Sequence, residues 1–141
     1  MIVGRTVEEL NLGDAAEHAK TISESDVYQF AGITGDLNPA HINKVYAEKT
    51  FFKERIAHGI LSTGLISAVI AMSLPGAGTI YLKQEVEFKA PVYIGDTITA
   101  RVEVIHIDKT KNRVTLKTVC VNQNGVVVID GQALVSPPKK K

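Results

Sequence analysis

One long uncharged segment constrains the fold of this chain more than any other feature. No Asp, Glu, Lys or Arg occurs between Ile56 and Leu74, and this length approaches what is needed to span a bilayer. Polar and small residues interrupt the segment, however, and no Trp or Tyr flanks its ends. The segment is therefore predicted to form a buried helix of a water-soluble protein, from Gly59 to Leu74, and not a membrane span.

The residues after this helix alternate between apolar and polar side chains, which is typical of half-buried strands. The first alternating run is Ile80 to Phe88. Turn signals then separate three further strands, predicted at 97–108, 113–123 and 126–135. A helix that is apolar on nearly all sides needs cover on nearly all sides, and a curved antiparallel sheet supplies it. The sequence therefore predicts an α+β fold in which four long strands wrap one buried helix.

The first half of the chain is predicted to hold loops and short helices. Ser23 to Asp26 form an approximate capping box, which favours a helix that begins there and ends at Gly35. The residues from Asp36 to Pro39 follow as a turn, because the residue before a proline is pushed out of the helical region. Asn43 is expected to cap a second short helix that runs through Lys49.

Composition limits the class of protein. The chain has 141 residues and a formal net charge of +1, so we expect one domain over residues 1–141, with a flexible tail at 136–141. This balanced charge argues against nucleic acid as a partner. The single cysteine, Cys120, lies in a strand-like run and is expected to be a buried thiol. The first ten residues lack an apolar run of signal-peptide length, so we expect a cytoplasmic protein.

Two polar features mark a candidate site. Asp36 and His41 stand on either side of a turn braced by Pro39, so a carboxylate and an imidazole are able to share one substrate. Turn chemistry alone also explains most of these residue types, and this alternative stays open for the cluster taken by itself. Gly59 lies at the predicted N-terminus of the buried helix, where free N–H groups favour negative charge. An acid, a base and an oxyanion donor are the parts needed to add water across a double bond conjugated to a carbonyl.

These residues carry a resemblance to a known family. The segment YQFAGITGDLNPAH at residues 28–41 resembles the signature of the MaoC-like (R)-specific enoyl-CoA hydratases, also called hydratase 2. IAHGIL at 56–61 resembles the family's entry into its central helix, and GTIYL and FKAPV at 78–82 and 88–92 resemble its first long strand. The similarity covers almost the whole chain. It implies a hot-dog fold, a homodimer joined through its sheets, and reversible hydration of trans-2-enoyl-CoA to (R)-3-hydroxyacyl-CoA.

The resemblance also implies roles for individual residues. Asp36 and His41 match the catalytic dyad, the Gly59 backbone N–H matches the oxyanion donor, and Ser67 matches a serine near the dyad. No metal or redox cofactor is implied, because the coenzyme A thioester is the substrate.

Other residues are assigned supporting or binding roles. Asn38 and Pro39 are interpreted as supports of the catalytic loop, and His58 as either a pocket residue or a satisfied histidine at the helix entry. The walls that limit acyl-chain length are predicted to be Leu61, Ile66 and Ile70. The cations available to the phosphates of coenzyme A are Lys53, Arg55 and Lys89.

Two alternative functions stay open. A MaoC-like dehydratase of 3-hydroxyacyl-carrier-protein substrates would keep the same dyad, and a non-catalytic acyl-CoA-binding subunit would share the fold. Hot-dog thioesterases and other carrier-protein dehydratases usually place a carboxylate on the central helix. This helix has none between Gly59 and Leu74, which counts against both.

Overall fold

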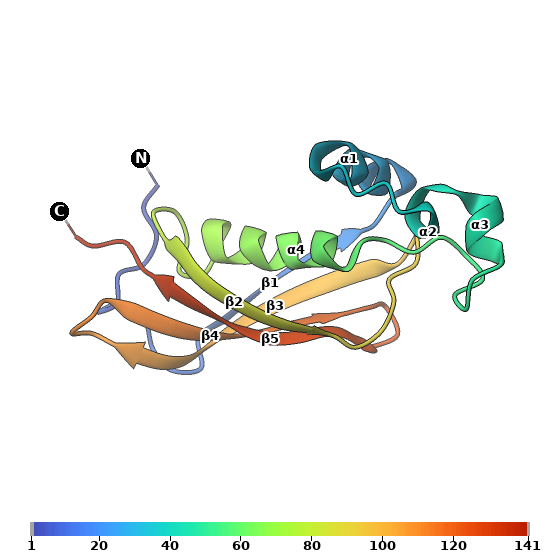
Figure 1. Cartoon of the computed structure of the whole chain (residues 1–141). Coiled ribbons are helices and arrows are strands. Elements are labelled where there is room, and N and C mark those ends of the chain that lie inside the picture. The colour runs from blue at the N-terminus through green and yellow to red at the C-terminus, as the bar shows by residue number, and fades with distance from the viewer. Residues whose placement is uncertain (1, 141) are drawn as a thin grey trace.

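A curved antiparallel sheet packs against one face of a long helix in the computed structural model, which describes residues 2–140 (Figure 1). The strands are β1 (Ala15–Thr21), β2 (Ile80–Phe88), β3 (Thr97–Asp108), β4 (Arg113–Val121) and β5 (Val127–Ser136), in the sheet order β1-β3-β4-β5-β2. The helices are α1 (Glu24–Thr34), α2 (Pro39–Ile42), α3 (Lys44–Glu48) and α4 (Gly59–Met72). This arrangement confirms the predicted α+β hot-dog architecture.

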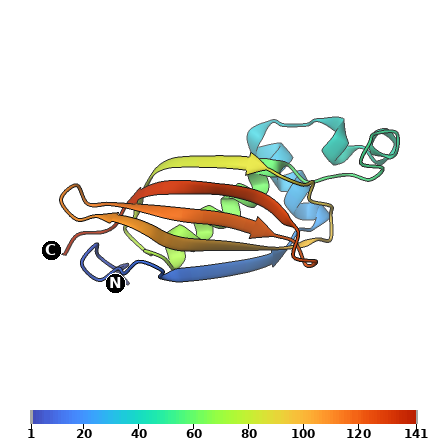
Figure 2. The same ribbon diagram turned by 90° about the horizontal axis from the view of Figure 1, so that it is seen from below.

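Helix α4 supplies the centre of the core. Its buried side chains include Ile66, Val69 and Ile70, and it packs on β1, β3 and β4. Figure 2 shows the opposite face of the sheet, with α4 behind the strands. Cover on nearly all sides was expected, but the face turned away from the sheet is open, since Ile60 is 56% and Met72 81% exposed. No helix among the described residues is long and apolar enough to cross a membrane.

The predicted strands and turns are largely confirmed, with one irregularity in β2. Gly95 and Gly125 lie in turns with φ of +98° and +75°, the region that costs glycine least. A register shift in the pairing of β2 with β5 lies between Tyr81 and Lys83. Tyr81, Gln84 and Val86 are therefore partly buried, whereas Ile80, Leu82 and Phe88 are exposed.

Two elements of the first half were missed in the sequence. The prediction of four strands is wrong by one, because β1 pairs with β3 and forms an edge of the sheet. Six of its seven residues are exposed, so no apolar alternation marked it. The predicted turn at Asp36 to Pro39 is correct only in part, because Pro39 begins the short helix α2. Proline is well suited to the first helical position.

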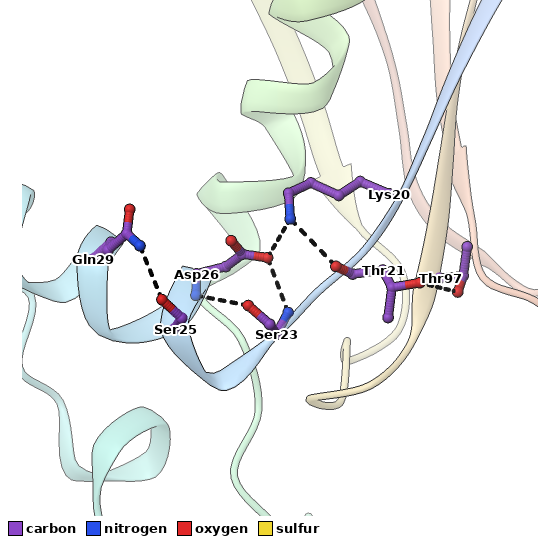
Figure 3. Close-up of polar contacts among 7 residues, drawn as sticks. All are labelled: Lys20, Thr21, Ser23, Ser25, Asp26, Gln29 and Thr97. Carbon is purple, nitrogen blue, oxygen red and sulfur yellow. Dashed lines mark hydrogen bonds and ion pairs between the residues drawn. The ribbon is translucent and has the colours of Figure 1, made fainter.

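The predicted capping box at the start of α1 is confirmed (Figure 3). The Ser23 hydroxyl accepts a hydrogen bond from the Asp26 N–H at 3.0 Å, and the Asp26 carboxylate accepts one from the Ser23 N–H at 2.9 Å. Lys20 on β1 donates to the same carboxylate at 2.7 Å, which ties the helix to the sheet. The helix ends at Gly35 with φ of +79°, so the chain turns sharply just before Asp36.

The chain end and the cysteine both pack against the body of the protein. The side-chain amide of Asn112, in the β3–β4 turn, donates to the Ser136 hydroxyl and to the Pro137 carbonyl, at 3.0 and 2.8 Å. The expected tail extends to Lys141, which, like Met1, lies outside the described residues. Cys120 is a buried free thiol, as predicted, and burial raises its pKa to about 12.

Candidate active site

Asp36 stands on an exposed loop between α1 and α2. Its backbone N–H donates to the Thr34 hydroxyl at 3.1 Å, and its carboxylate accepts a hydrogen bond from the Asn38 N–H at 3.3 Å. Both contacts are local and resemble those of a loop cap. The carboxylate is nevertheless exposed and keeps further acceptor capacity for a ligand.

His41 is placed by the short helix α2. The Asn38 side chain caps this helix by accepting a hydrogen bond from the Ala40 N–H at 3.0 Å, and Pro39 occupies its first turn. Both residues thus support the loop as predicted. His41 Nδ1 lies 2.7 Å from the Ile56 carbonyl oxygen. Because a carbonyl only accepts, Nδ1 carries the proton, and Nε2 of the neutral ring presents a lone pair.

His58 joins these two residues at the entry to α4. It is 3% exposed, its Nε2 lies 2.9 Å from the Asp36 carbonyl oxygen, and its ring centroid lies 3.9 Å from that of His41. One ligand atom from each of Asp36, His41 and His58 lies within 4.8 Å of the others. Two imidazoles on one zinc ion, with Zn–N bonds of about 2.1 Å at tetrahedral angles, hold their centroids about 5 Å apart. The stacked rings are closer than that and do not fit a tetrahedral metal site.

Gly59 is the first residue of α4 and borders a cavity. Its N–H has no hydrogen-bond partner among residues 2–140, as expected for the first turn of a helix. A cavity of about 440 Å³ lies beside it and is largely apolar. The lining includes His41, Phe52, Gly59, Ser62, Phe88 and Ile129. The structure therefore brings a histidine with a free nitrogen and a free backbone N–H to the same cavity.

Ser67 and the predicted acyl-chain walls lie elsewhere on α4. Ser67 lines a second groove of about 440 Å³, between α4 and β2, together with Phe30, Gly64 and Tyr81. Ile66 and Ile70 are 0% and 2% exposed in the core, and Leu61 packs against that core. Leu61, Ile66 and Ile70 line neither the cavity beside Gly59 nor the groove beside Ser67. Their role in limiting the length of the acyl chain therefore stays a prediction.

Two of the three predicted cations are paired with carboxylates. Arg55 donates to Glu24 at 2.8 Å and to the Tyr28 hydroxyl at 2.6 Å, and the hydrogen bond from Arg55 lowers the pKa of Glu24. Lys89 pairs with Glu87. Lys53 borders a smaller cavity of about 250 Å³ next to Arg55.

Several cavity residues were missed in the sequence. Phe52, Ser62 and Phe88 received no role there, although Phe88 lies in a segment that carries the resemblance. Gly59 was the strongest signal in the sequence that another group approaches the start of the helix closely. The structure shows that this group is Phe88, because a Cβ atom at position 59 would lie 2.7 Å from its ring. The Ser62 hydroxyl is fully buried and lacks a hydrogen-bond partner among the described residues.

A curved sheet on a central helix defines a hot-dog fold, and Asp36, His41 and the free Gly59 N–H at the helix entry are the arrangement expected of a hydratase in this fold. Comparison with known proteins agrees with this class. The chain belongs to the family of MaoC-like domains, which its sequence matches over residues 10–125.

Individual relatives narrow the class further. The chain is 53% identical to an (R)-specific enoyl-CoA hydratase of Rhodospirillum rubrum, over 94% of this chain and 92% of the relative. It is 46% identical to a 3-hydroxybutyryl-CoA dehydratase of Methylorubrum extorquens, over 95% and 85%. Its structure resembles the unliganded R-hydratase PhaJ1 of Pseudomonas aeruginosa with a TM-score of 0.93 and 45% identity, covering 99% of this chain and 89% of that one.

Proposed function

We propose that this protein adds water to trans-2-enoyl-CoA to give (R)-3-hydroxyacyl-CoA, and catalyses the reverse dehydration. The observation that carries the proposal is the convergence of Asp36, His41 and the free Gly59 N–H at the entry of α4. The similarity to hydratases of this specificity supports it. The enzyme is a hydro-lyase.

The Gly59 N–H supplies the electrophilic part of the mechanism. The thioester carbonyl accepts this hydrogen bond, so that negative charge on its oxygen is stabilised as the C2–C3 double bond is lost. The N-terminal end of α4 adds its dipole to the same effect. One donor of this kind contributes roughly 3 kcal/mol to transition-state stabilisation.

Asp36 and His41 handle the water molecule. The water lies between the carboxylate and the free Nε2 of His41, and its oxygen attacks C3 while the pair takes up one proton. The pair also delivers one proton to C2 on the same face of the substrate. The net change is the addition of one H and one OH, and the enzyme returns to its starting protonation state.

We propose that the reaction needs no metal or redox cofactor. The acid, the base and the oxyanion donor all come from the chain, and water is the second substrate. The short separation of the two histidine rings supports the absence of a metal site.

We also propose a cytoplasmic location. The free, buried thiol of Cys120 is compatible with a reducing compartment.

We propose a homodimer as the working assembly. Within residues 2–140, strand β2 pairs only with β5 and leaves its other edge unpaired. Exposed apolar side chains lie along this edge and on the adjoining face of α4, including Leu82, Phe88 and Ile60. A second copy joined through the sheets covers this surface and pairs the edge.

The test is the loss of enoyl absorbance with crotonyl-CoA, followed by chiral analysis of the product. Wild type is expected to consume the substrate and give the (R)-alcohol. The nearly isosteric Asp36→Asn variant is expected to lose about 10³-fold or more in kcat, because general acid–base catalysis of this kind contributes about 10²–10⁴-fold. Its melting temperature should stay close to that of wild type.

Other outcomes identify the alternatives. Activity retained in Asp36→Asn with a large fall in stability means that Asp36 is only a loop cap. Turnover of carrier-protein thioesters without turnover of any acyl-CoA, crotonyl or longer, indicates a carrier-protein dehydratase. No turnover of either class at catalytic protein concentrations indicates an acyl-CoA-binding subunit.

A further inference from the structure

We propose that His58 is a positioning residue, which holds the backbone of Asp36 and the ring of His41 in their working orientation at the same time. The inference deepens the proposed function, because it concerns the same Asp36–His41 pair. It rests on one hydrogen bond, one stack of rings and the burial of His58.

The hydrogen bond anchors the Asp36 loop. His58 Nε2 lies 2.9 Å from the Asp36 carbonyl oxygen, and Nε2 carries the proton because the carbonyl only accepts. The other hydrogen bonds of Asp36 in the described chain stay within residues 34–38 and connect the loop only to itself. The bond from His58 instead links this exposed loop to α4 across 22 positions of sequence. It therefore fixes the distance between the carboxylate-bearing residue and the Gly59 N–H.

The stack of rings orients His41. A single hydrogen bond from His41 Nδ1 to the Ile56 carbonyl leaves the ring able to rotate about that bond. The His58 ring prevents this rotation, because it lies at a centroid distance of 3.9 Å with an interplanar angle of 32°. Phe30 of α1 packs on His58 in turn, with centroids 4.7 Å apart. The direction of the free Nε2 of His41 is thus set by a stack of three rings from α1, α2 and the entry of α4.

A histidine that only filled space at position 58 would be energetically unfavourable, because one of its ring nitrogens is buried without a hydrogen bond. The residue is 3% exposed, and its Nδ1 is buried without a hydrogen-bond partner in the described chain. An unpaired buried polar atom costs free energy that an apolar ring of similar size avoids. The donor to Asp36 is what a histidine adds at this position and phenylalanine lacks.

Two matched variants separate the two functions of the side chain. His58→Phe keeps an aromatic ring in the stack and removes the donor, whereas His58→Gln keeps an N–H at a similar reach and removes the ring. We expect kcat for crotonyl-CoA to fall about tenfold in each and about 100-fold in His58→Ala, because small misplacements of catalytic groups cost this much. KM is expected to change less than about threefold, since the lost interactions do not bind substrate.

A control and a double variant exclude a purely structural role. Val69→Ala removes buried volume from α4 in the core and is expected to lower the melting temperature with kcat unchanged. In a His41→Ala background, His58→Gln is expected to cost no further activity, because no ring is left to orient. Equal losses from His58→Gln with and without His41, or a lowered melting temperature with full kcat in all three His58 variants, would overturn the proposal.

A readout that needs no activity keeps the two proposals apart. In proton NMR spectra, the His41 ring protons of wild type are expected to give one fixed set of NOEs, because the ring has a single orientation about its hydrogen bond to Ile56, and those of His58→Ala the averaged NOEs of a rotating ring. If wild type shows no hydratase activity but the His41 ring becomes mobile in His58→Ala as expected, the proposed function fails and the positioning role stands. A His41 ring that keeps its single orientation in His58→Ala overturns the positioning role whatever the activity.

Discussion

Gly59 contributes two features to the site: a free N–H group and the space left by its missing side chain. The absence of a side chain leaves room for the Phe88 ring, which a Cβ atom at position 59 would approach to 2.7 Å. Both residues line the cavity beside His41. One residue therefore presents the N–H proposed as the oxyanion donor and leaves space for Phe88 beside the cavity.

This dual role predicts the behaviour of Gly59→Ala. The variant keeps the N–H but pushes the Phe88 ring aside, so we expect kcat/KM for crotonyl-CoA to fall about 10- to 100-fold. Adding Phe88→Leu, which gives the new methyl group space, should restore part of the loss. The control Gly32→Ala alters an exposed site on α1 with nothing within 4 Å and should leave kcat/KM unchanged. If Phe88→Leu does not restore activity, the loss in Gly59→Ala comes from misalignment of the residue 59 N–H and not from crowding against Phe88.

The residues proposed to be catalytic were easier to single out in the sequence than the neighbours that surround them. Asp36, His41 and Gly59 were found in the sequence because their residue types match a reaction and lie at loop or helix ends. Phe52 and Phe88 were not, because their place at the cavity depends on how distant segments fold back. The sequence also left His58 undecided, and only the geometry shows its bond to Asp36.

At the scale of elements, the cap of α1 carries a pH-dependent contribution to stability. The hydrogen bond from Lys20, and then that from the Ser23 backbone, lowers the pKa of Asp26 below its ordinary value. A carboxyl group with a lower pKa in the folded state stabilises the fold above its unfolded pKa, and this contribution is lost as the pH falls through the folded value. The cap thus weakens in acid.

Asp26→Asn tests this contribution. We expect the free energy of unfolding at pH 7 to fall by about 0.5–1 kcal/mol, because the neutral amide loses the ion pair with Lys20 and the favourable charge at the helix N-terminus. The difference from wild type should begin to shrink as the pH falls below about 4, the ordinary value for aspartate, and should continue to shrink as the pH falls through the lower pKa of the folded state. Urea unfolding at both pH values measures it, with Glu8→Gln as the control at an exposed residue that makes no ion pair in the described chain. A difference that stays constant with pH would contradict the assignment.

Elements with strong local signals were predicted well, and those fixed by tertiary contacts were not. The capping box, the glycine turns and the apolar helix each have a local physical cause, and all are present. Strand β1 exposes almost every residue, so it exists because β3 offers it an edge. The irregularity in β2 likewise depends on β5.

At the scale of the whole molecule, α4 packs on β1, β3 and β4 and leaves a groove along β2. This groove and the unpaired edge of β2 are the surface that a second copy is proposed to cover.

The proposed dimer predicts a mass in solution. Sedimentation velocity at micromolar concentration is expected to give about twice the 15.2 kDa of one chain. Leu82→Lys on the unpaired edge should shift the protein toward the monomer, because a buried charge opposes association. Ile105→Lys on β3, at 42% exposure against 44% for Leu82, is the matched control and should stay dimeric. A monomeric wild type would refute the dimer.

Two of the proposed catalytic residues, Asp36 and His41, lie outside the sheet and the central helix that form the core. Helices α2 and α3 project past the end of the sheet in Figure 1, and α2 packs on α3 and α1. Segments with few core contacts open at a lower free energy than the whole domain. On heating, local opening of the segment that holds α2 and α3 is therefore enough to displace His41 and abolish activity. Inactivation is expected at a lower temperature than unfolding of the sheet and α4.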